Sequence, residues 1–413
     1  MQLQMWLDRL KNIHIKEMDL SLERVEIVAN RLNLKKSPCP LITVAGTNGK
    51  GSTVAALQAI YQAAGYKVGA YTSPYLFRYQ EQIALTGSPA SEEMIIQAFE
   101  EIQTILGEMT LTAFEFSTLA ALLIFKKTAR DIWILEVGLG GRYDAVNILP
   151  ADVAIVTSIA LDHMEWLGST REHIGYEKAG IFKPNCFALC SDFDPPASLI
   201  HYAETIKAPL WCQKTHFGFK KKNQSWDFWS QRNTILNLPL PSLALQNMAS
   251  ALMAVELLQE KVAVPRSSIE QGLQSISLRG RIQVVEGPIQ HIFDVSHNPA
   301  SVALLAEYLK SHPIQGKTIA LFSMLGDKDI EGSLQAIQNY IDHWYVAALQ
   351  ETSRAASVDR LMTAFKNRGL LREMISVPNL KEGYFTAKNQ ASTKDRLVIF
   401  GSFHTVAETY SLL

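Results

Sequence analysis

The chain has 413 residues, of which 47% are hydrophobic and 19% charged, with a formal net charge of −1. This balance is typical of a folded globular protein, and the length predicts two domains. The near-neutral charge excludes a basic surface, so we expect neither nucleic acid nor an anionic membrane as a partner. The longest wholly apolar run, Leu119–Phe125, is too short to span a bilayer, and the N-terminus lacks the apolar core of a signal peptide. With only four cysteines, a disulfide framework is not expected, and we predict a cytoplasmic protein.

Residues 1–36 show helical spacing of apolar residues in two segments that meet at a polar joint around residues 17–21. The apolar run Leu41–Ala45 then predicts a buried strand, and Thr53–Ala64 predicts a helix that ends at Gly65. Between them lies the sequence Gly-Thr-Asn-Gly-Lys-Gly-Ser, residues 46–52. A strand, a glycine loop and a helix in this order form the setting that a phosphate-binding loop requires.

The residue types of this loop fit the binding of ATP. Glycines allow successive backbone N–H groups to turn towards an anion, and Lys50 adds a positive charge for the outer phosphates. The hydroxyl of Ser52 is placed to reach a Mg²⁺ ion carried by the nucleotide. The spacing departs from the common phosphate-loop pattern, because Gly51 separates the lysine from the hydroxyl residue. An ordinary strand-to-helix turn is the alternative.

Polar residues follow the next predicted strands, where ligands of parallel sheets usually bind. Ser73 follows the strand Lys67–Tyr71, although a serine before proline is also a common turn residue. Glu136 lies near the C-terminal end of the buried strand Asp131–Val137, beside several glycines, a position typical of a metal-binding acid rather than a solvated one.

His163 follows the strand Val153–Ser158, and from sequence it can be a ligand, a general base or a turn residue. Lys178 on the helix Thr170–Phe182 has by itself the appearance of a surface lysine. Further elements expected in this half are the helices Ser91–Leu106, Thr112–Thr128, Pro195–Lys207 and Leu243–Gln259, the strand Cys186–Cys190 and hairpin strands within His216–Trp229.

The pattern changes near Ser267–Gly287, and we predict domains at residues 1–286 and 287–413. Strands and helices alternate again in the second part, which predicts another parallel α/β unit. The expected strands are Ile282–Val285, His291–Val295, Thr318–Leu325, Trp344–Leu349 and Arg396–Phe400, and the expected helices are Pro299–Ser311, Ile330–Ile341, Ser357–Arg368, Leu380–Ala391 and Phe403–Leu413. Polar clusters at 294–299, 326–329 and 401–404 follow strand ends. A nucleotide site combined with such clusters suits either phosphoryl transfer or ATP-driven bond formation.

Several longer motifs occur in a fixed order along the chain. They are AGTNGKGST at residues 45–53, TSPY at 72–75, LEVGLGGRYDAVN at 135–147, SIALDH at 158–163, EKAGIF at 177–182 and FDVSHNP at 293–299. Together they resemble the folylpolyglutamate synthases of the Mur ligase superfamily, most of all the bacterial bifunctional dihydrofolate synthase/folylpolyglutamate synthases. The segments LSLERV (20–25), LTAFEF (111–116) and GSFHTVAE (401–408) extend this resemblance to nearly the whole chain.

The resemblance implies a P-loop ATPase-like domain with a parallel sheet, followed by a smaller Rossmann-like α/β domain on the glutamate side. It implies that ATP and two Mg²⁺ ions bind, and that Lys178 is N-carboxylated. The implied nucleotide contacts are Gly46, Thr47, Asn48, Gly49, Lys50, Gly51, Ser52, Asn247, Arg281 and Asp294. The implied metal ligands are Ser52, Ser73, Glu136 and His163, and the implied catalytic residues are Lys50, His163, Lys178 and His297.

The resemblance also places the substrates. The implied pterin-binding residues are Glu17, Met18, Asp19, Leu20, Thr112, Ala113, Phe114, Glu115, Tyr143, Asp144 and Ala145. Asp294, His297 and Ser402 match positions around the incoming amino acid. The chain departs from the family pattern at Ser21, Tyr75, Tyr143, Val146 and Ser296, and Tyr75 and Tyr143 lie where they can alter the pterin pocket.

The implied reaction joins L-glutamate to dihydropteroate and to reduced folates through an acyl phosphate, in a monomeric enzyme with small-molecule substrates only. A monofunctional folylpolyglutamate synthase is the nearest alternative. A Mur-type amino-acid ligase would need a UDP-binding domain before the phosphate loop, and only 40 residues precede the loop's strand. A non-catalytic nucleotide sensor would not need the metal-ligand types together with Lys178.

Overall fold

The computed structural model describes residues 2–14, 19–350, 352 and 354–413. Glu17 and Met18, two of the predicted pterin contacts, therefore lie outside the described residues. The chain divides into two compact units, Met1–Ser277 and Leu278–Leu413, each described here by itself. The division comes earlier than the predicted one after residue 286, because strand β12 (Gln283–Val285) pairs with β13 (Gln290–Asp294) in the sheet of the second unit.

The first unit is built on an eight-stranded sheet with the order β4-β3-β2-β5-β1-β6-β7-β8. Its strands are β1 (Leu41–Ala45), β2 (Val68–Tyr71), β3 (Ile83–Leu85), β4 (Ser88–Pro89), β5 (Ile132–Glu136), β6 (Val153–Val156), β7 (Phe187–Cys190) and β8 (Leu210–Cys212). Six neighbouring strands run parallel, whereas β3 and β4 are antiparallel. The phosphate-loop strand β1 is central, so its carboxyl end lies beside the ends of β5 and β6.

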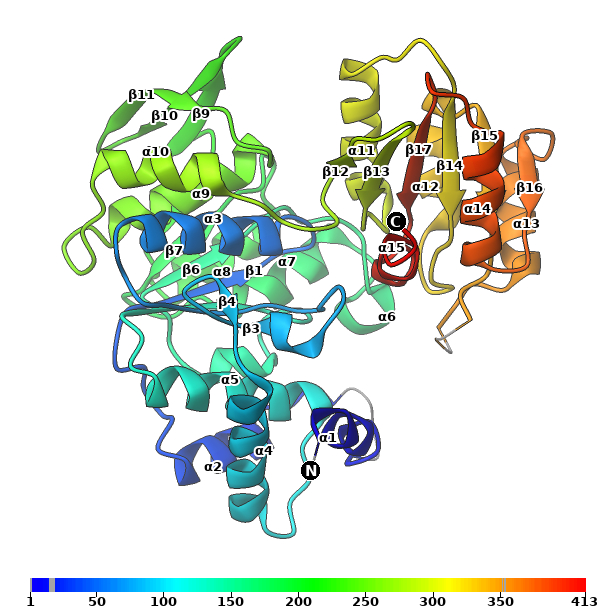
Figure 1. Ribbon diagram of the computed structural model, residues 1–413. Helices are drawn as coiled ribbons and strands as arrows, with labels where there is room; N and C mark the ends of the chain where they lie inside the picture. Colours follow the sequence, from blue (N-terminus) through cyan, green and yellow to red (C-terminus); the bar gives the residue numbers. More distant parts are fainter. Residues whose placement is uncertain (1, 15–18, 351, 353) are drawn as a thin grey trace. The chain divides into compact units, whose positions relative to one another are not determined.

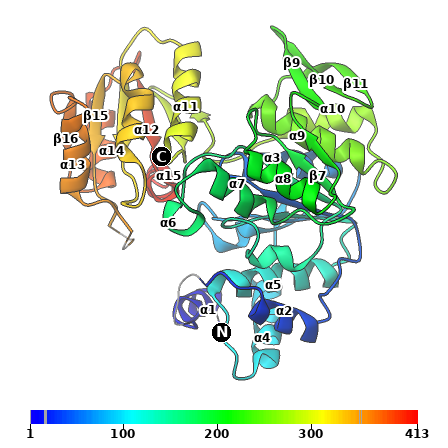
Figure 2. The same cartoon turned by 180° about the vertical axis from the view of Figure 1, so that it is seen from behind.

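Both faces of this sheet are covered, which explains why β1 is apolar at nearly every position. Leu41 and Ala45 point to one face, and Ile42 and Val44 point to the other. The first face carries α1 (Leu3–Leu10), α2 (Glu23–Arg31), α4 (Glu92–Leu106), α5 (Ala113–Lys127), α7 (Arg171–Ala179) and α8 (Ala197–Thr205). The second carries α3 (Lys50–Ala63), α9 (Leu245–Leu257) and α10 (Arg266–Ser275). In Figure 1, α3, α9 and α10 lie above this sheet and α2, α4 and α5 lie below it, and Figure 2 shows the same arrangement from behind.

A separate three-stranded antiparallel sheet lies against α9 on the second face. It contains β9 (Phe217–Lys221), β10 (Ser225–Ser230) and β11 (Thr234–Pro239). Sequence reasoning predicted the hairpin of β9 and β10 but missed β11. It also missed β3, β4, β8 and the four-residue helix α6 (Met164–Leu167), because segments of two to four residues are too short to show a period.

The second unit has a six-stranded sheet with the order β12-β13-β17-β14-β15-β16. Its remaining strands are β14 (Thr318–Phe322), β15 (His343–Val346), β16 (Met374–Ser376) and β17 (Arg396–Phe400). Its helices are α11 (Pro299–Ser311), α12 (Ile330–Ile337), α13 (Val358–Asn367), α14 (Leu380–Gln390) and α15 (Phe403–Tyr410). The expected α/β architecture is confirmed, except that the edge strand β12 is antiparallel. Among the described helices, none has the length and apolarity that crossing a membrane requires.

Candidate active site

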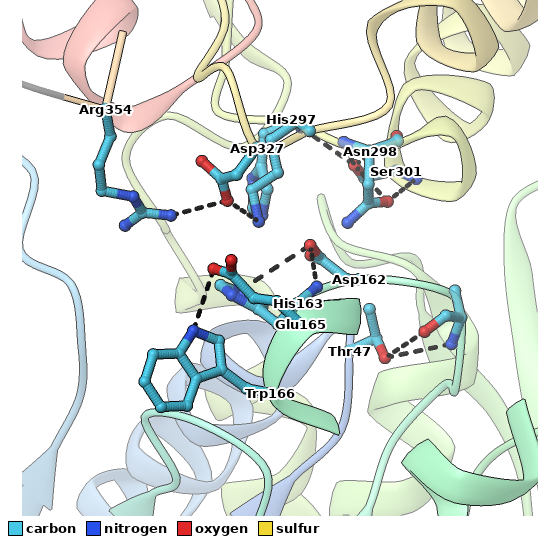
Figure 3. Close-up of polar contacts among 12 residues, drawn as sticks. Thr47, Asp162, His163, Glu165, Trp166, His297, Asn298, Ser301, Asp327 and Arg354 are labelled. Carbon is cyan, nitrogen blue, oxygen red and sulfur yellow. Dashed lines mark hydrogen bonds and ion pairs between the residues drawn. The ribbon is translucent and has the colours of Figure 1, made fainter. Parts of the chain in front are cut away.

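The glycine loop joins β1 to α3 in the first unit and is held by the next strand end. Thr47 donates its backbone N–H to the carbonyl of Ser158 over 2.7 Å, and its hydroxyl lies 3.1 Å from both the carbonyl and the N–H of Ala160. Figure 3 shows Thr47 with the two contacts of its hydroxyl. Gly46 has φ of +139°, and a Cβ atom there would lie 1.7 Å from the Thr157 hydroxyl oxygen. Only glycine fits this position, which explains the first glycine of the motif.

Two lysines converge on the first carbonyl of the loop. Lys50 Nζ lies 3.2 Å from the Gly46 carbonyl oxygen, and Lys178 Nζ from α7 lies 3.0 Å from the same atom. Lys178 is 4% exposed, so it is not the surface lysine that its sequence context suggested. Burial, and then the nearby charge of Lys50, lower the pKa of Lys178 to about 7. A buried amine that is partly neutral near pH 7 can act as a nucleophile towards CO₂.

The carboxylate of Glu136 ends β5, directly beside β1, and is 5% exposed. Ser73 follows β2 on the other side of β5, and Ser52 is buried in the first turn of α3. One carboxylate and two hydroxyls are oxygen donors of the kind that Mg²⁺ prefers. Among the described residues, no three His, Cys, Asp or Glu side chains converge into a metal site. Magnesium binding by Ser52, Ser73 and Glu136 stays a prediction.

His163 lies at the turn between β6 and α6, with φ of +50°. The Asp162 carboxylate accepts the backbone N–H of His163 at 2.9 Å and lies 3.9 Å from His163 Nε2 (Figure 3). The histidine side chain is 29% exposed and the aspartate only 8%. A buried carboxylate beside a partly exposed imidazole orients the ring. This is compatible with each of the roles left open by the sequence.

The 138–147 loop is organised by a carboxylate rather than by glycines alone. Asp144 Oδ2 accepts the backbone N–H groups of Gly138 and Leu139 at 3.0 Å each, and Oδ1 accepts that of Val146 at 3.0 Å. Burial raises the pKa of Asp144 to about 6, although these three donors favour its charged form. The side chain of Asp144 is thus buried and holds the loop, whereas the neighbouring Tyr143 is 49% exposed.

The predicted pterin segments are brought together in the first unit. A Cβ atom on Gly138 would lie 2.7 Å from the Phe114 ring, so the start of α5 packs on the 138–147 loop. Asp19 forms an ion pair with Arg24 over 3.1 Å, and Arg24 also pairs with Glu115 over 3.0 Å. Arg24 therefore links Asp19 to the start of α5.

Asn247, the predicted nucleotide contact on α9, approaches the loop closely. A Cβ atom on Gly49, whose φ is +96°, would lie 2.4 Å from Asn247 Oδ1. The sequence could not show that Asn247 lies near the phosphate loop. Asn247 belongs to α9 and Gly49 precedes α3, and these two helices lie on one face of the sheet.

In the second unit, Asp294 shapes the loop that carries His297. Its carboxylate accepts the backbone N–H groups of Ile282 and Ser296 at 2.8 Å and 2.9 Å. His297 Nδ1 lies 2.9 Å from the carbonyl of Val295, which directs Nε2 away from the backbone. Phe403 contacts both the Arg281 guanidinium and the His297 ring, at 5.6 Å and 6.2 Å between group centres. The predicted site residues of the second unit therefore lie at one edge of its sheet. They are Arg281, Asp294, His297 and Ser402, the last of which is the N-cap of α15.

Sequence reasoning noted the polar cluster 326–329 but gave its residues no role, and it missed Arg354. Arg354 donates to Asp327 over 2.8 Å, and Lys328 Nζ lies 3.8 Å from the same carboxylate oxygen (Figure 3). Although burial opposes it, the hydrogen bond and charge of Arg354 lower the pKa of Asp327. The Lys328 side chain is 4% exposed, and a lysine is rarely buried this deeply unless it is paired.

Comparisons with known proteins agree with this division of the chain. The family model of the Mur ligase middle domain matches residues 44–255. The model of the Mur ligase glutamate ligase domain matches residues 280–403.

Individual relatives match along the full length. The chain is 41% identical to the dihydrofolate synthase/folylpolyglutamate synthase of Escherichia coli strain K12, covering 99% of this chain and 94% of the relative. It superposes on the E. coli FolC structure in complex with DHPP and ADP with a TM-score of 0.95 and 41% identity, over 100% and 97% of the two chains. A crystal structure of a bifunctional folylpolyglutamate synthase/dihydrofolate synthase with Mn, AMPPNP and L-glutamate bound gives a TM-score of 0.93 and 40% identity, over 100% and 98%.

Proposed function

Because the chain belongs to the Mur ligase family, and within it to the dihydrofolate synthase/folylpolyglutamate synthases, we propose that it is an ATP-dependent amide ligase. It adds L-glutamate to dihydropteroate, which gives dihydrofolate, and to reduced folates, which gives polyglutamates. The observation that carries the proposal is the pair of lysines on one carbonyl of the glycine loop. Many enzymes have a phosphate loop. Simple nucleotide binding does not need a second, buried lysine whose amine contacts the loop's first residue.

The reaction makes an amide from a carboxylate, which is a poor electrophile and needs activation. The free carboxylate of the pteroate or folate attacks the γ-phosphorus of ATP, which forms an acyl phosphate and releases ADP. The amine of L-glutamate then attacks the acyl carbon, and inorganic phosphate leaves. The chain's contribution is charge neutralisation by Lys50 and the N–H groups of residues 46–52, the usual main factor in phosphoryl transfer.

Lys178 supports the proposal through its chemistry. Its neutral amine attacks CO₂, and with loss of one proton it becomes a carbamate. This modification converts a cation beside Lys50 into an anion, which removes the repulsion between the two lysines and supplies oxygen ligands near the loop. Mg²⁺ held by Ser52, Ser73, Glu136 and His163 would supply positive charge to the transferring phosphoryl group.

The second unit is proposed to bind L-glutamate. Asp294, His297 and Ser402 are the predicted contacts, and the buried Lys328 with Arg354 adds positive charge for a dicarboxylic amino acid. Arg281 with Asn247 and Asp294 is proposed to contact the nucleotide. ATP, the pterin substrates and L-glutamate are then the partners, and the enzyme is proposed to act as a cytoplasmic monomer.

A phosphate-release assay tests the proposal. The protein is incubated with ATP, Mg²⁺ and L-glutamate, and with dihydropteroate or tetrahydrofolate in separate reactions. Release with both pterins is the expected result. Release with tetrahydrofolate alone would reduce the function to folylpolyglutamate synthase, whereas ATP hydrolysis independent of glutamate and pterin would contradict the ligase assignment.

A further inference from the structure

Arg24 joins two segments that are far apart in the sequence. It lies in the first turn of α2, and its guanidinium makes ion pairs with Asp19 over 3.1 Å through Nη1 and with Glu115 over 3.0 Å through Nη2. The Asp19 and Arg24 side chains are each 22% exposed and that of Glu115 is 5% exposed. Ion pairs of this low exposure fix geometry better than solvated surface pairs do.

The Glu115 end of this link fixes the start of α5. Glu115 Oε2 accepts the backbone N–H of Thr112 at 2.7 Å, and the Thr112 hydroxyl accepts that of Glu115 at 3.2 Å. This reciprocal pair is a capping box. Because one carboxylate oxygen binds Arg24 and the other binds Thr112, the position of the guanidinium determines the position of the 112–115 segment.

The Asp19 end is held at several atoms. Arg24 also donates to the Ser21 hydroxyl over 3.2 Å and to the Asp19 carbonyl over 3.4 Å. His14 Nε2 lies 3.4 Å from the Asp19 carboxylate, and its Nδ1 lies 2.7 Å from the Thr110 hydroxyl. A planar guanidinium holds its donors at fixed mutual distances, which a lysine cannot do. The Arg24 fork therefore sets the distance between Asp19 and the N-terminus of α5.

We infer that Arg24 is a positioning residue for the pterin substrate, acting through Asp19 and Glu115. The inference rests on the proposed function and on the predicted pterin-binding residues in the segments 19–20 and 112–115. The contacts described for Arg24 are with Asp19, Ser21 and Glu115, none of which is among the residues proposed for ATP or L-glutamate. Its loss should therefore change the affinity for the pterin and leave the ATP site intact. A side chain that orients the residues around a ligand typically changes binding by tenfold or more.

Steady-state kinetics of Arg24→Gln, Arg24→Lys and the matched control Arg31→Gln test the inference. Arg31 lies on the same helix but donates to the carbonyls of Ile105 and Leu106, on α4. In Arg24→Gln the KM for dihydropteroate is expected to rise about tenfold, with the KM values for ATP and L-glutamate unchanged. Arg24→Lys should recover only part of the loss, and Arg31→Gln should leave all KM values at the wild-type level.

The opposing results are distinct. The inference is overturned if the KM for dihydropteroate in the Arg24 variants equals that of Arg31→Gln, or if the KM for ATP rises with it. Arg24→Lys is the deciding variant if Arg24→Gln does not fold, because it keeps the charge but not the fork. Wild-type protein without pterin-dependent phosphate release would instead contradict the proposed function, so the two failures are separable.

Discussion

Lys178 is the residue whose chemistry depends most on its surroundings. Its pKa is lowered from 10.5 to about 7 by burial and by the charge of Lys50. The neutral amine, which is the form that reacts with CO₂, therefore increases as the pH rises through about 7. A carbamate formed at Lys178 would carry a negative charge that both Lys50 and a bound cation would stabilise.

We predict that ¹³C-bicarbonate labels Lys178 and that the carbamate signal in ¹³C NMR grows between about pH 6 and about pH 8. Lys178→Ala should remove the signal together with activity. Lys183→Ala is the control, because Lys183 is a half-buried neighbour whose pKa burial also lowers. A fully active preparation without label at Lys178 would contradict the prediction.

Glu136 is the acid that ends β5, the strand beside β1, and its proposed task is to hold Mg²⁺. In Glu136→Gln the amide keeps the shape but loses the charge that a hard cation needs. We expect turnover to fall about 100-fold, with a shift to higher Mg²⁺ requirement and little change in nucleotide affinity.

Initial rates against Mg²⁺ concentration and titration calorimetry with ADP separate these two effects. Glu256→Gln is a suitable control, since Glu256 is a partly buried acid of the first unit that accepts a hydrogen bond from Ser230 on β10. Loss of ADP binding without a change in the Mg²⁺ requirement would show that Glu136 is not a metal ligand.

At the scale of elements, the β1–α3 connection depends on how closely β6 approaches it. Gly46 and Gly65 both have positive φ, +139° and +87°, but only Gly46 faces an obstruction, the side chain of Thr157. Backbone strain costs an alanine on the order of 1–3 kcal/mol at each site. Displacing Thr157 adds a further ~1–3 kcal/mol at Gly46.

The comparison of Gly46→Ala with Gly65→Ala therefore isolates the close approach. Urea unfolding followed by circular dichroism should show a clearly lower midpoint for Gly46→Ala, together with lost ADP binding, whereas Gly65→Ala should bind ADP normally. Equal midpoints for the two variants would mean that the loop relaxes around the new methyl group.

At the scale of the whole molecule, each unit has its own buried core and sheet, and the proposed substrates need no second copy of the chain. We expect a monomer with a mass of 46.0 kDa. Light scattering during size-exclusion chromatography, with and without ADP, measures this mass directly. A stable dimer at micromolar concentration would contradict the expectation.

Features that depend only on residues close together in the chain could be predicted from the sequence. The glycine loop, its strand and its helix are local, so their order alone predicted a phosphate site. The alternation of strand and helix patterns likewise predicted two α/β units, and the motif order predicted the family. Short strands such as β4, β8 and β16 were not predicted. Two or three residues show no measurable period of apolar positions, and they form a strand only beside a partner strand.

Tertiary structure decided what the individual polar residues do. Lys178 has the sequence context of a surface lysine, yet α7 packs against the loop and buries its amine on Gly46. The resemblance implied that Asp144 contacts the substrate. In the structure its carboxylate accepts three backbone N–H groups of its own loop. Arg24 lies in the LSLERV motif, and the sequence predicted no role for it. The fold brings Glu115 of α5 within ion-pair distance of its guanidinium. Burial and the neighbouring side chains determine the charge of each of these groups and the atoms that it contacts. Both depend on residues that are distant in the chain.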